Sequence, residues 1–294
     1  MQKLLITGGD GFIARSLAEG LADDFPIESA NRQVLDLTDS EKVADYLKRN
    51  RFDTIIHTAT YDAAPYFSTK DPAQVLEQNL RMFFNIARCQ DDFGKMIYFG
   101  SGAEFGRDHW HPKMSEDYFG AHVPEDQYGL SKYIMTQHAR LSSNIYNLRI
   151  FGLFGKYDDW RYRFIPNTCC QAVFDMPITI YRDAVYDFLF IDDLVRIVRW
   201  IISGQPSRNI YNACSGRAYG FKELAETIVE ISGKNLDINL KQKGRGREYS
   251  GDNALLLQEL NGFQFTPIRE SIQQLYQWYQ QHRHLIDRTE LLAA

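Results

Sequence analysis

The sequence has little cysteine and no long apolar run, and these absences exclude several classes of protein. Only four of the 294 residues are cysteines. Their positions, 89, 169, 170 and 214, form neither a disulfide framework nor a metal-ligand motif. We therefore expect reduced, mostly buried thiols, no bound metal and a cytoplasmic location. No segment offers the about 18 consecutive apolar residues that a membrane span needs, and no secretory signal opens the chain.

Long runs of one charge are also missing. The formal net charge is -5, and hydrophobic and charged residues make up 44% and 24% of the chain, which is ordinary for a globular protein. The one basic cluster, Lys241–Arg247 (KQKGRGR), is short, so we expect it to contact a local anion and not a nucleic acid. The composition therefore argues against a nucleic-acid or membrane partner.

What the first half of the chain does contain is a regular alternation of short apolar segments and helical patterns. The predicted strands are Lys3–Thr7, Pro26–Ala30, Thr54–Ala59, Lys95–Gly100 and Ile145–Phe151. The predicted helices are Phe12–Leu21, Ser40–Asn50, Pro72–Cys89 and Gln127–Leu141. Repeated βα units of this kind predict an α/β fold, a doubly wound Rossmann sheet of parallel strands with helices on both faces.

The alternation breaks down after about residue 155, where aromatic residues and prolines dominate. We predict that residues 1–154 form a dinucleotide-binding Rossmann domain, to which residues 187–212 return. Residues 155–186 and 213–294 are predicted to form a smaller C-terminal lobe that binds the substrate.

A glycine-rich turn, Thr7–Ala14 (TGGDGFIA), follows the first predicted strand and opens the first predicted helix. Gly8 permits the tight turn. Gly11 has no Cβ, so a pyrophosphate can approach the backbone N–H groups of Phe12 and Ile13 at the positive end of the helix dipole. The turn predicts a nicotinamide dinucleotide, and a glycine turn without a ligand is the alternative.

The end of the second predicted strand bears on which dinucleotide binds. It reads Ser29–Arg32 (SANR), with no carboxylate to hold the adenosine ribose hydroxyls. Arg32 could instead form a forked hydrogen bond to a 2′-phosphate, although an ordinary solvated arginine is the alternative. The sequence favours NADP(H), leaves NAD(H) open, and predicts Asn31 and Arg32 as cofactor contacts.

Tyr128 and Lys132 are four residues apart, on one face of a predicted helix. An unperturbed tyrosine has a pKa of about 10, too high for efficient proton exchange at neutral pH. The charge of Lys132 is expected to lower the pKa of Tyr128 and tune it as a general acid or base, and Lys132 could also reach the nicotinamide ribose. This spacing is common on helix surfaces, but together with the upstream glycine turn it becomes specific.

Ordered motifs between residues 7 and 193 carry a family resemblance. They are Thr7–Ala14, Asp36-Leu37, His57–Thr60, Asp71-Pro72 with Asn79, Ser101–Gly106, Tyr128–Lys132, Arg149–Gly155 and Asp187–Asp193. In this order the chain resembles the extended short-chain dehydrogenase/reductases, in the NAD-dependent epimerase/dehydratase branch that modifies nucleotide-activated sugars.

The resemblance implies roles for individual residues. Ser101 would be the third catalytic residue, hydrogen-bonding the substrate oxygen that Tyr128 protonates, with a strand-end cap as the alternative. Cofactor contacts are implied at Asp36, Leu37, Thr58, Ala59, Thr60 and Asn79, the last more as a helix-packing amide than as a catalytic group. A homodimer through helices 72–89 and 127–141 is also implied.

The expected substrate contacts depart from the family pattern. The arginine of the family's Arg-Asp/Glu-Phe triplet, a diphosphate contact in many members, is Tyr186 here. We therefore expect Arg245 or Arg247 to contact the diphosphate of the substrate. Arg163, which follows the fifth predicted strand, is a further expected substrate contact, with a solvated loop residue as the alternative.

Missing acid and base groups indicate the reaction. Dehydratase relatives carry an Asp-Glu pair directly after the catalytic Ser or Thr, and here those positions are Gly102 and Ala103. Glu104 comes one step too late, and strand alternation would turn it to a different face. The cysteine that some reductase-epimerases place two residues beyond the serine is also Ala103. The remaining Ser/Tyr/Lys set predicts NAD(P)H-dependent reduction of a 4-keto, 6-deoxy nucleotide sugar. A nucleotide-sugar 4-epimerase with tightly bound NAD and a non-enzymatic cofactor sensor stay open as alternatives.

Overall fold

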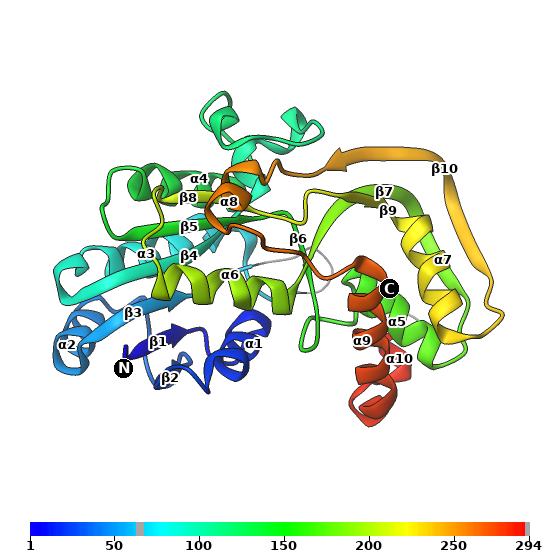
Figure 1. The fold of residues 1–294 in the computed structure, drawn as a ribbon, viewed down its shortest axis with the longest axis horizontal. Coiled ribbons are helices and arrows are strands. Elements are labelled where there is room, and N and C mark those ends of the chain that lie inside the picture. Colours follow the sequence, from blue (N-terminus) through cyan, green and yellow to red (C-terminus); the bar gives the residue numbers. More distant parts are fainter. Residues whose placement is uncertain (63–67, 292–294) are drawn as a thin grey trace.

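The computed structural model describes residues 1–62 and 68–291, and its first half is built on a parallel sheet (Figure 1). The strand order is β2-β1-β3-β4-β5-β8 in a six-stranded sheet within the described residues. The strands are β1 (Leu4–Thr7), β2 (Ile27–Ala30), β3 (Phe52–His57), β4 (Phe93–Ser101), β5 (Ile145–Ile150) and β8 (Ile210–Ala213). All five pairings in this sheet are parallel. The prediction of a doubly wound Rossmann sheet is confirmed.

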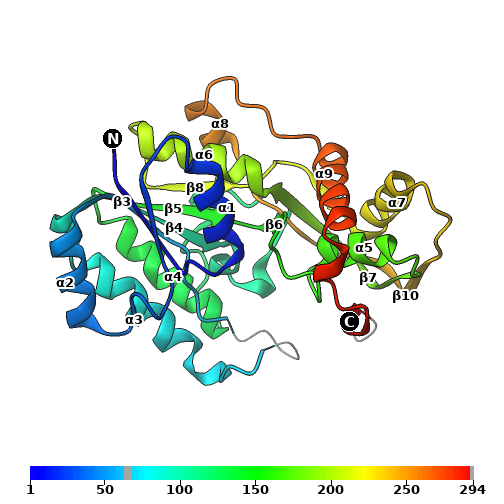
Figure 2. The ribbon, with the colours of Figure 1, turned by 90° about the horizontal axis from the view of Figure 1, so that it is seen from below.

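Side-chain alternation along the strands divides the core into two layers. Leu4 and Ile6 face one layer, which α1 and α6 cover, while Leu5 faces the other, which α2, α3 and α4 cover. Figure 2 shows the helices on the two sides of the sheet. The helices are α1 (Phe12–Leu21), α2 (Ser40–Asn50), α3 (Val75–Ala87), α4 (Gln127–Ala139) and α6 (Ile191–Ser203). Strands buried on both faces explain the near-continuous apolar segments of the sequence.

A second, smaller sheet lies beside the first (Figure 1). Its order is β10-β7-β6, and β9 pairs antiparallel with β7. The elements of this part are β6 (Gly152–Phe154), α5 (Phe164–Val173), β7 (Ile178–Phe190), β9 (Ala218–Gly220), α7 (Phe221–Ser232), β10 (Ile238–Tyr249), α8 (Ala254–Glu259), α9 (Ile268–Gln281) and α10 (Arg288–Leu291). Short 3₁₀ turns occupy Pro72–Gln74, Gln90–Asp92, Gly102–Phe105, Arg107–His109, Glu116–Tyr118 and Arg283–Leu285.

The division of the chain into a Rossmann domain and a smaller lobe stays a prediction. The two separate sheets are the structural feature on which such a division would rest. Residues 191–203 (α6) and 210–213 (β8) pack on or join the first sheet, where a returning segment was expected. Residues 292–294 of the predicted lobe lie outside the described residues. No described helix is both long and apolar enough to cross a membrane.

Strand order reverses between β1 and β3, and the carboxyl ends of these strands bring the glycine turn against the segment that follows β3. Gly8 has a φ of 71°, in the left-handed region. A Cβ at Gly8 would lie 2.8 Å from the Cα of Ala59 and 3.1 Å from Thr58 Oγ1. Both the backbone conformation and the close approach therefore require glycine at this position.

Gly8→Ala is expected to lower the free energy of unfolding by more than the about 1–2 kcal/mol of left-handed strain, because the new Cβ also collides with backbone. Urea unfolding measures this. Gly262→Ala is the matched control, since Gly262 has a φ of 80° but no described atom within 4 Å of an added Cβ. Equal losses in the two variants would contradict the collision.

Candidate active site

The N-terminus of α1 is open to an anionic ligand. Its N-cap is Gly11; among the described residues no side chain caps it, and its first turn holds no acidic residue. Phe12 and Ile13, the first two residues of this helix, line a cavity. Uncapped N–H groups at the positive end of a helix dipole suit a pyrophosphate. The residues present therefore fit a dinucleotide cofactor.

The segment after β3 forms the wall facing this helix end. The Thr58 hydroxyl donates to the Thr7 carbonyl at 2.7 Å, and the Thr60 hydroxyl donates to Asn79 Oδ1 at 3.3 Å. Thr58 and Thr60 line the cavity, whereas Ala59 contributes its backbone beside Gly8. Asn79 is buried. Its Oδ1 accepts a hydrogen bond from the Tyr61 N–H, and its Nδ2 donates to the Tyr61 carbonyl. Asn79 therefore fixes the segment after β3 through Thr60 and Tyr61, and its contact with a cofactor stays a prediction.

Residues after β2 lie next to the glycine turn, because the Gly9 N–H donates to the Ala30 carbonyl at 3.1 Å. The Asn31 side chain accepts from the N–H groups of Gln33 and Val34, so it mainly shapes this loop. Arg32 is 79% exposed and pairs with Asp36 at 3.4 Å.

Asp36 also accepts hydrogen bonds from the N–H and the hydroxyl of Thr38. The hydrogen bonds from Thr38, followed by the charge of Arg32, lower the pKa of Asp36. Leu37 is buried in the same core cluster as Val43 and Leu47 of α2, so its main role is in the hydrophobic core.

The three predicted catalytic residues meet in one cavity of about 980 Å³. Ser101 comes from the end of β4, and Tyr128 and Lys132 come from the first turns of α4. The same cavity is lined by Phe12, Ile13, Thr58 and Thr60. The geometry thus places the Ser/Tyr/Lys set and the open end of α1 around a common space.

Lys132 is buried, and its ammonium donates to the Phe99 carbonyl at 2.9 Å. It lies 5.7 Å from the centre of the Tyr128 ring. Burial lowers the pKa of Lys132 to about 8, against the opposing charges of Glu104 and Asp62. The buried imidazole of His57, on β3, has its pKa lowered to about 3 by burial and then by Lys132, so it is neutral.

The expected direction of the Tyr128 pKa shift is wrong. Burial, followed by the charge of Asp62, raises the pKa of Tyr128 to about 12, while Arg163, a hydrogen bond with Ser101 and Arg107 lower it only in part. Desolvation of the phenolate outweighs these groups, and the Lys132 ammonium is directed to a backbone carbonyl. Tyr128 is therefore a neutral phenol at physiological pH, which suits a proton donor.

Ser101 caps a turn and also faces the cavity, and its catalytic role stays a prediction. Its hydroxyl caps the following 3₁₀ turn by accepting from the Ala103 N–H at 3.2 Å, and it also lines the cavity. Its own N–H donates to Glu104 Oε1 at 2.9 Å. The Ser101 hydroxyl lies 3.5 Å from the phenol oxygen of Tyr249, a residue to which no sequence motif pointed.

Glu104 faces away from the cavity, as predicted, but for a different reason. It lies in the 3₁₀ turn Gly102–Phe105 and not in a strand, so strand alternation does not apply. Its carboxylate pairs with Arg149 at 2.9 Å, and both side chains are 0% exposed. Thr136 donates to the same carboxylate at 2.9 Å. Sequence reasoning missed this buried network behind the catalytic residues.

Aromatic and cationic side chains also line the cavity. They are Trp110, Tyr186 and Tyr249, together with Arg107 and Arg163. Arg107 pairs with Asp126 at 3.2 Å, and Arg163 lies 3.9 Å from Asp62.

Arg245 and Arg247 are not among the residues that line this cavity, contrary to expectation. Both lie on β10, and the Arg247 guanidinium donates to the Asp108 carbonyl at 2.9 Å. β10 pairs with β7 along its length, and its basic segment is mostly exposed, so these side chains extend over the outside of the sheet. Arg107 and Arg163 are the arginines among the described residues that line the cavity.

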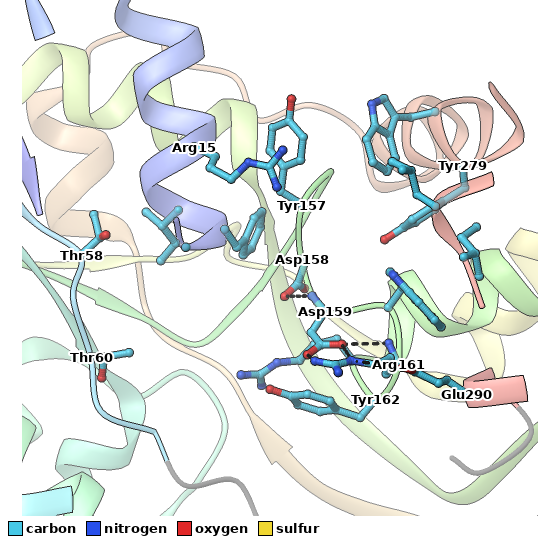
Figure 3. A pocket seen from close by; sticks show the side chains of 18 residues that line it. Arg15, Thr58, Thr60, Tyr157, Asp158, Asp159, Arg161, Tyr162, Tyr279 and Glu290 are labelled. Carbon is cyan, nitrogen blue, oxygen red and sulfur yellow. Dashed lines mark hydrogen bonds and ion pairs between the residues drawn. The ribbon is translucent and has the colours of Figure 1, made fainter. Parts of the chain in front are cut away.

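A second cavity of about 740 Å³ adjoins the first and shares Thr58, Thr60, Asp158 and Arg163 with it (Figure 3). Figure 3 shows Asp158 and Asp159 beneath Tyr157, and Asp159 pairs with Arg161 at 2.6 Å. Burial raises the pKa of Asp158 to about 7, against the charge of Arg163. This carboxyl therefore titrates near neutral pH beside the shared wall of the two cavities.

Comparison with known proteins identifies the family to which this site belongs. Residues 4–214 match the model of the NAD dependent epimerase/dehydratase family. The chain belongs to this family. It is an NAD(P)-dependent enzyme of the short-chain oxidoreductase type, and the nicotinamide cofactor predicted from the glycine turn follows from the family.

Individual relatives are distant in sequence but similar along most of their length. The chain is 26% identical over 251 residues to a dTDP-4-dehydro-6-deoxy-D-allose reductase from Streptomyces sp, covering 79% of this chain and 75% of the relative. It superposes on a GDP-L-fucose synthetase from Naegleria fowleri bound to NADP with a TM-score of 0.83 at 18% identity, covering 96% and 94% of the two chains. A Thermus thermophilus UDP-glucose 4-epimerase in complex with NAD gives 0.77 at 19% identity, covering 94% and 98%.

Glu104→Gln is expected to lower the free energy of unfolding by about 3–5 kcal/mol, because it leaves Arg149 as an uncompensated buried charge. Urea unfolding with circular dichroism measures the change. Glu77→Gln removes one partner of the exposed Glu77–Arg81 pair on α3 and should cost only about 0.2–0.5 kcal/mol. A Glu104 variant that loses no more stability than the Glu77 variant would contradict the importance of the buried pair.

Proposed function

We propose that this enzyme reduces a 4-keto, 6-deoxy nucleotide sugar to the 4-hydroxy sugar with a nicotinamide cofactor. The observation that carries the proposal is the neutral phenol of Tyr128 beside Ser101, in a cavity that the open end of α1 also lines. Gly102 and Ala103 offer no side chain that could move a proton, and Glu104 is buried behind the cavity. One hydride and one proton are all that this site needs to deliver for a ketone reduction.

Each catalytic residue has a distinct part in this reaction. When bound, the nicotinamide cofactor supplies the hydride. Ser101 hydrogen-bonds the substrate carbonyl oxygen, and Tyr128 gives its proton to that oxygen. Lys132 stabilises the resulting phenolate with its charge and holds the ribose of the cofactor. The raised pKa keeps Tyr128 protonated at neutral pH, which is the state that a ketone reduction requires of its proton donor.

Arg107 and Arg163 are proposed to contact the diphosphate of the substrate, in the place that sequence analysis gave to Arg245 and Arg247. Both line the catalytic cavity, and both already face carboxylates that a diphosphate would replace or compete with. The Streptomyces relative, a reductase of a dTDP-4-dehydro-6-deoxy sugar, supports this substrate class. The homodimer through α3 and α4 stays a prediction.

A 4-epimerase is the second candidate, because the same three catalytic residues serve it and the Thermus epimerase shares the fold. It differs from a reductase in consuming no net cofactor. In an epimerase the bound sugar also has to rotate in the site between two half-reactions.

The wild-type enzyme is expected to oxidise NADPH in the presence of a 4-keto-6-deoxy nucleotide sugar, and Tyr128→Phe should reduce turnover at least about a hundredfold, because the general acid is lost. Absorbance follows the cofactor and NMR identifies the 4-hydroxy product. Tyr133→Phe is the matched control, since Tyr133 lies on the same helix and hydrogen-bonds Gln137. Interconversion of 4-hydroxy epimers without net NADPH oxidation would establish the epimerase instead.

NADP(H) is the proposed cofactor, with Arg32 as the residue that selects it. Arg32→Ala is expected to weaken NADPH binding, because a charge-assisted hydrogen bond is lost. Such a bond contributes roughly ten- to hundredfold to affinity, and we expect the lower end of this range because the site is exposed. NADH binding should not change. Fluorescence titration with both cofactors measures this, and Arg49→Ala, in an exposed α2 pair, is the control. An unchanged NADPH-to-NADH ratio would exclude Arg32 from the selection.

A further inference from the structure

A third hydroxyl group stands beside Ser101 and Tyr128 in the catalytic cavity, and it comes from the other end of the chain. Tyr249 is the last residue of β10, and its side chain is buried. Its phenol oxygen lies 3.5 Å from Ser101 Oγ. Tyr128 lines the same cavity as Ser101 and Tyr249. Three side-chain hydroxyl groups therefore border this cavity.

The position of the Tyr249 phenol depends on the lack of a side chain at residue 102. A Cβ on Gly102 would lie 2.6 Å from the phenol oxygen of Tyr249 and 2.8 Å from Phe151. The Tyr249 phenol thus fills the space next to the position where dehydratase relatives carry an acid. The hydroxyl of Tyr249, from β10, thus occupies the space that a side chain at position 102 would fill.

The ring of Tyr249 is held firmly on several sides. It lies 4.0 Å from the ring of Trp110, 5.1 Å from Phe151 and 5.2 Å from Tyr186, measured between ring centres. A phenol ring packed among three aromatic rings has little freedom to rotate away from Ser101. Its hydroxyl is therefore a pre-positioned hydrogen-bonding group.

From this constellation, and resting on the proposed function, we propose that Tyr249 hydrogen-bonds the 3-hydroxyl of the sugar, so that the substrate is an α-hydroxy ketone. Ser101 and Tyr128 together hold the 4-keto oxygen. Of the two carbons beside the ketone, C3 carries a hydroxyl, whereas C5 carries the ring oxygen and the methyl carbon C6, neither of which can donate a hydrogen bond. Neighbouring oxygens on a sugar ring lie about one hydrogen-bond length apart. An oxygen on C3 therefore falls within reach of a third hydroxyl that is next to Ser101.

Tyr249 recognises this hydroxyl and does not abstract a proton from carbon. Burial raises the pKa of Tyr249 well above its ordinary value, with the hydrogen bond to Ser101 opposing only in part. A neutral phenol can donate or accept a hydrogen bond but is a poor base. Without the 3-hydroxyl, this buried phenol faces a substrate that offers it no partner, which is the basis of discrimination.

The experiment pairs the deletion of a hydroxyl from the enzyme with its deletion from the substrate. Wild type and Tyr249→Phe are assayed with a 4-keto-6-deoxy and a 4-keto-3,6-dideoxy sugar on the same nucleotide. Wild type should prefer the 3-hydroxy sugar by roughly tenfold or more in kcat/KM, the equivalent of an unpaired buried hydroxyl. In Tyr249→Phe, kcat/KM for the 3-hydroxy sugar should fall by about that factor, whereas kcat/KM for the 3,6-dideoxy sugar should stay unchanged. NADPH affinity should not change in either protein.

Tyr186→Phe serves as the matched control, because Tyr186 lines the same cavity and packs on Tyr249. It is expected to affect both sugars by the same factor. Equal losses with both sugars in Tyr249→Phe would overturn the assignment while leaving the reductase in place. A wild type that oxidises NADPH with neither sugar would overturn the proposed function and this inference with it.

Discussion

The buried carboxylate of Glu104 connects the proposed catalytic residues to the sheet. Its two oxygens accept hydrogen bonds from the backbone of Ser101, from Thr136 on α4 and from the Arg149 guanidinium on β5. The strand end before Ser101 is held as well, since the Gly100 N–H donates to Asn147 Oδ1 at 2.9 Å and Lys132 donates to the Phe99 carbonyl. Polar groups in a dry interior tolerate little movement, because any lost hydrogen bond leaves an unsatisfied group. The positions of Ser101 and Lys132 thus follow from one network.

The same network balances the charges around the site. Lys132 and Arg149 are two buried cations, and Glu104 is the anion that lies between their elements. A Cβ at Gly100 would lie 2.2 Å from Glu104 Oε1, so the glycine before Ser101 leaves room for the carboxylate. Glu104 opposes the effect of burial on the pKa of Lys132. A carboxylate outside the cavity, together with that of Asp62, therefore limits how far burial lowers the pKa of this ammonium.

The parts of the fold and site that sequence could predict are those set by local pattern. The alternation of apolar and helical segments predicted five of the six strands of the first sheet, all except β8, and the spacing of Tyr128 and Lys132 predicted their common helix face. The predicted third strand, Thr54–Ala59, is Phe52–His57, since the Thr58 hydroxyl turns to the Thr7 carbonyl as the chain leaves the sheet.

Contacts between distant segments could not be predicted in this way. Tyr249 and Ser101 are 148 positions apart, and no periodicity relates them. Arg245 and Arg247 were expected in the cavity because they are basic, but a long strand determines the direction of their side chains. The sign of the Tyr128 shift was missed because burial is a property of the whole fold.

The way the chain crosses between the two sheets limits how the enzyme can move. Phe151 alone separates β5 from β6, and β7 runs into α6 at Phe190-Ile191 without an intervening loop. These two crossings lack the loop residues that usually absorb a hinge rotation, whereas residues 214–217 between β8 and β9 and residues 250–253 between β10 and α8 form loops. Phe151 also lines the cavity of Ser101 and Tyr128. We therefore expect the wall that Phe151 forms to keep its position between the free and the bound enzyme, so that this side of the cavity selects the sugar by steric rejection instead of by closure around the ligand.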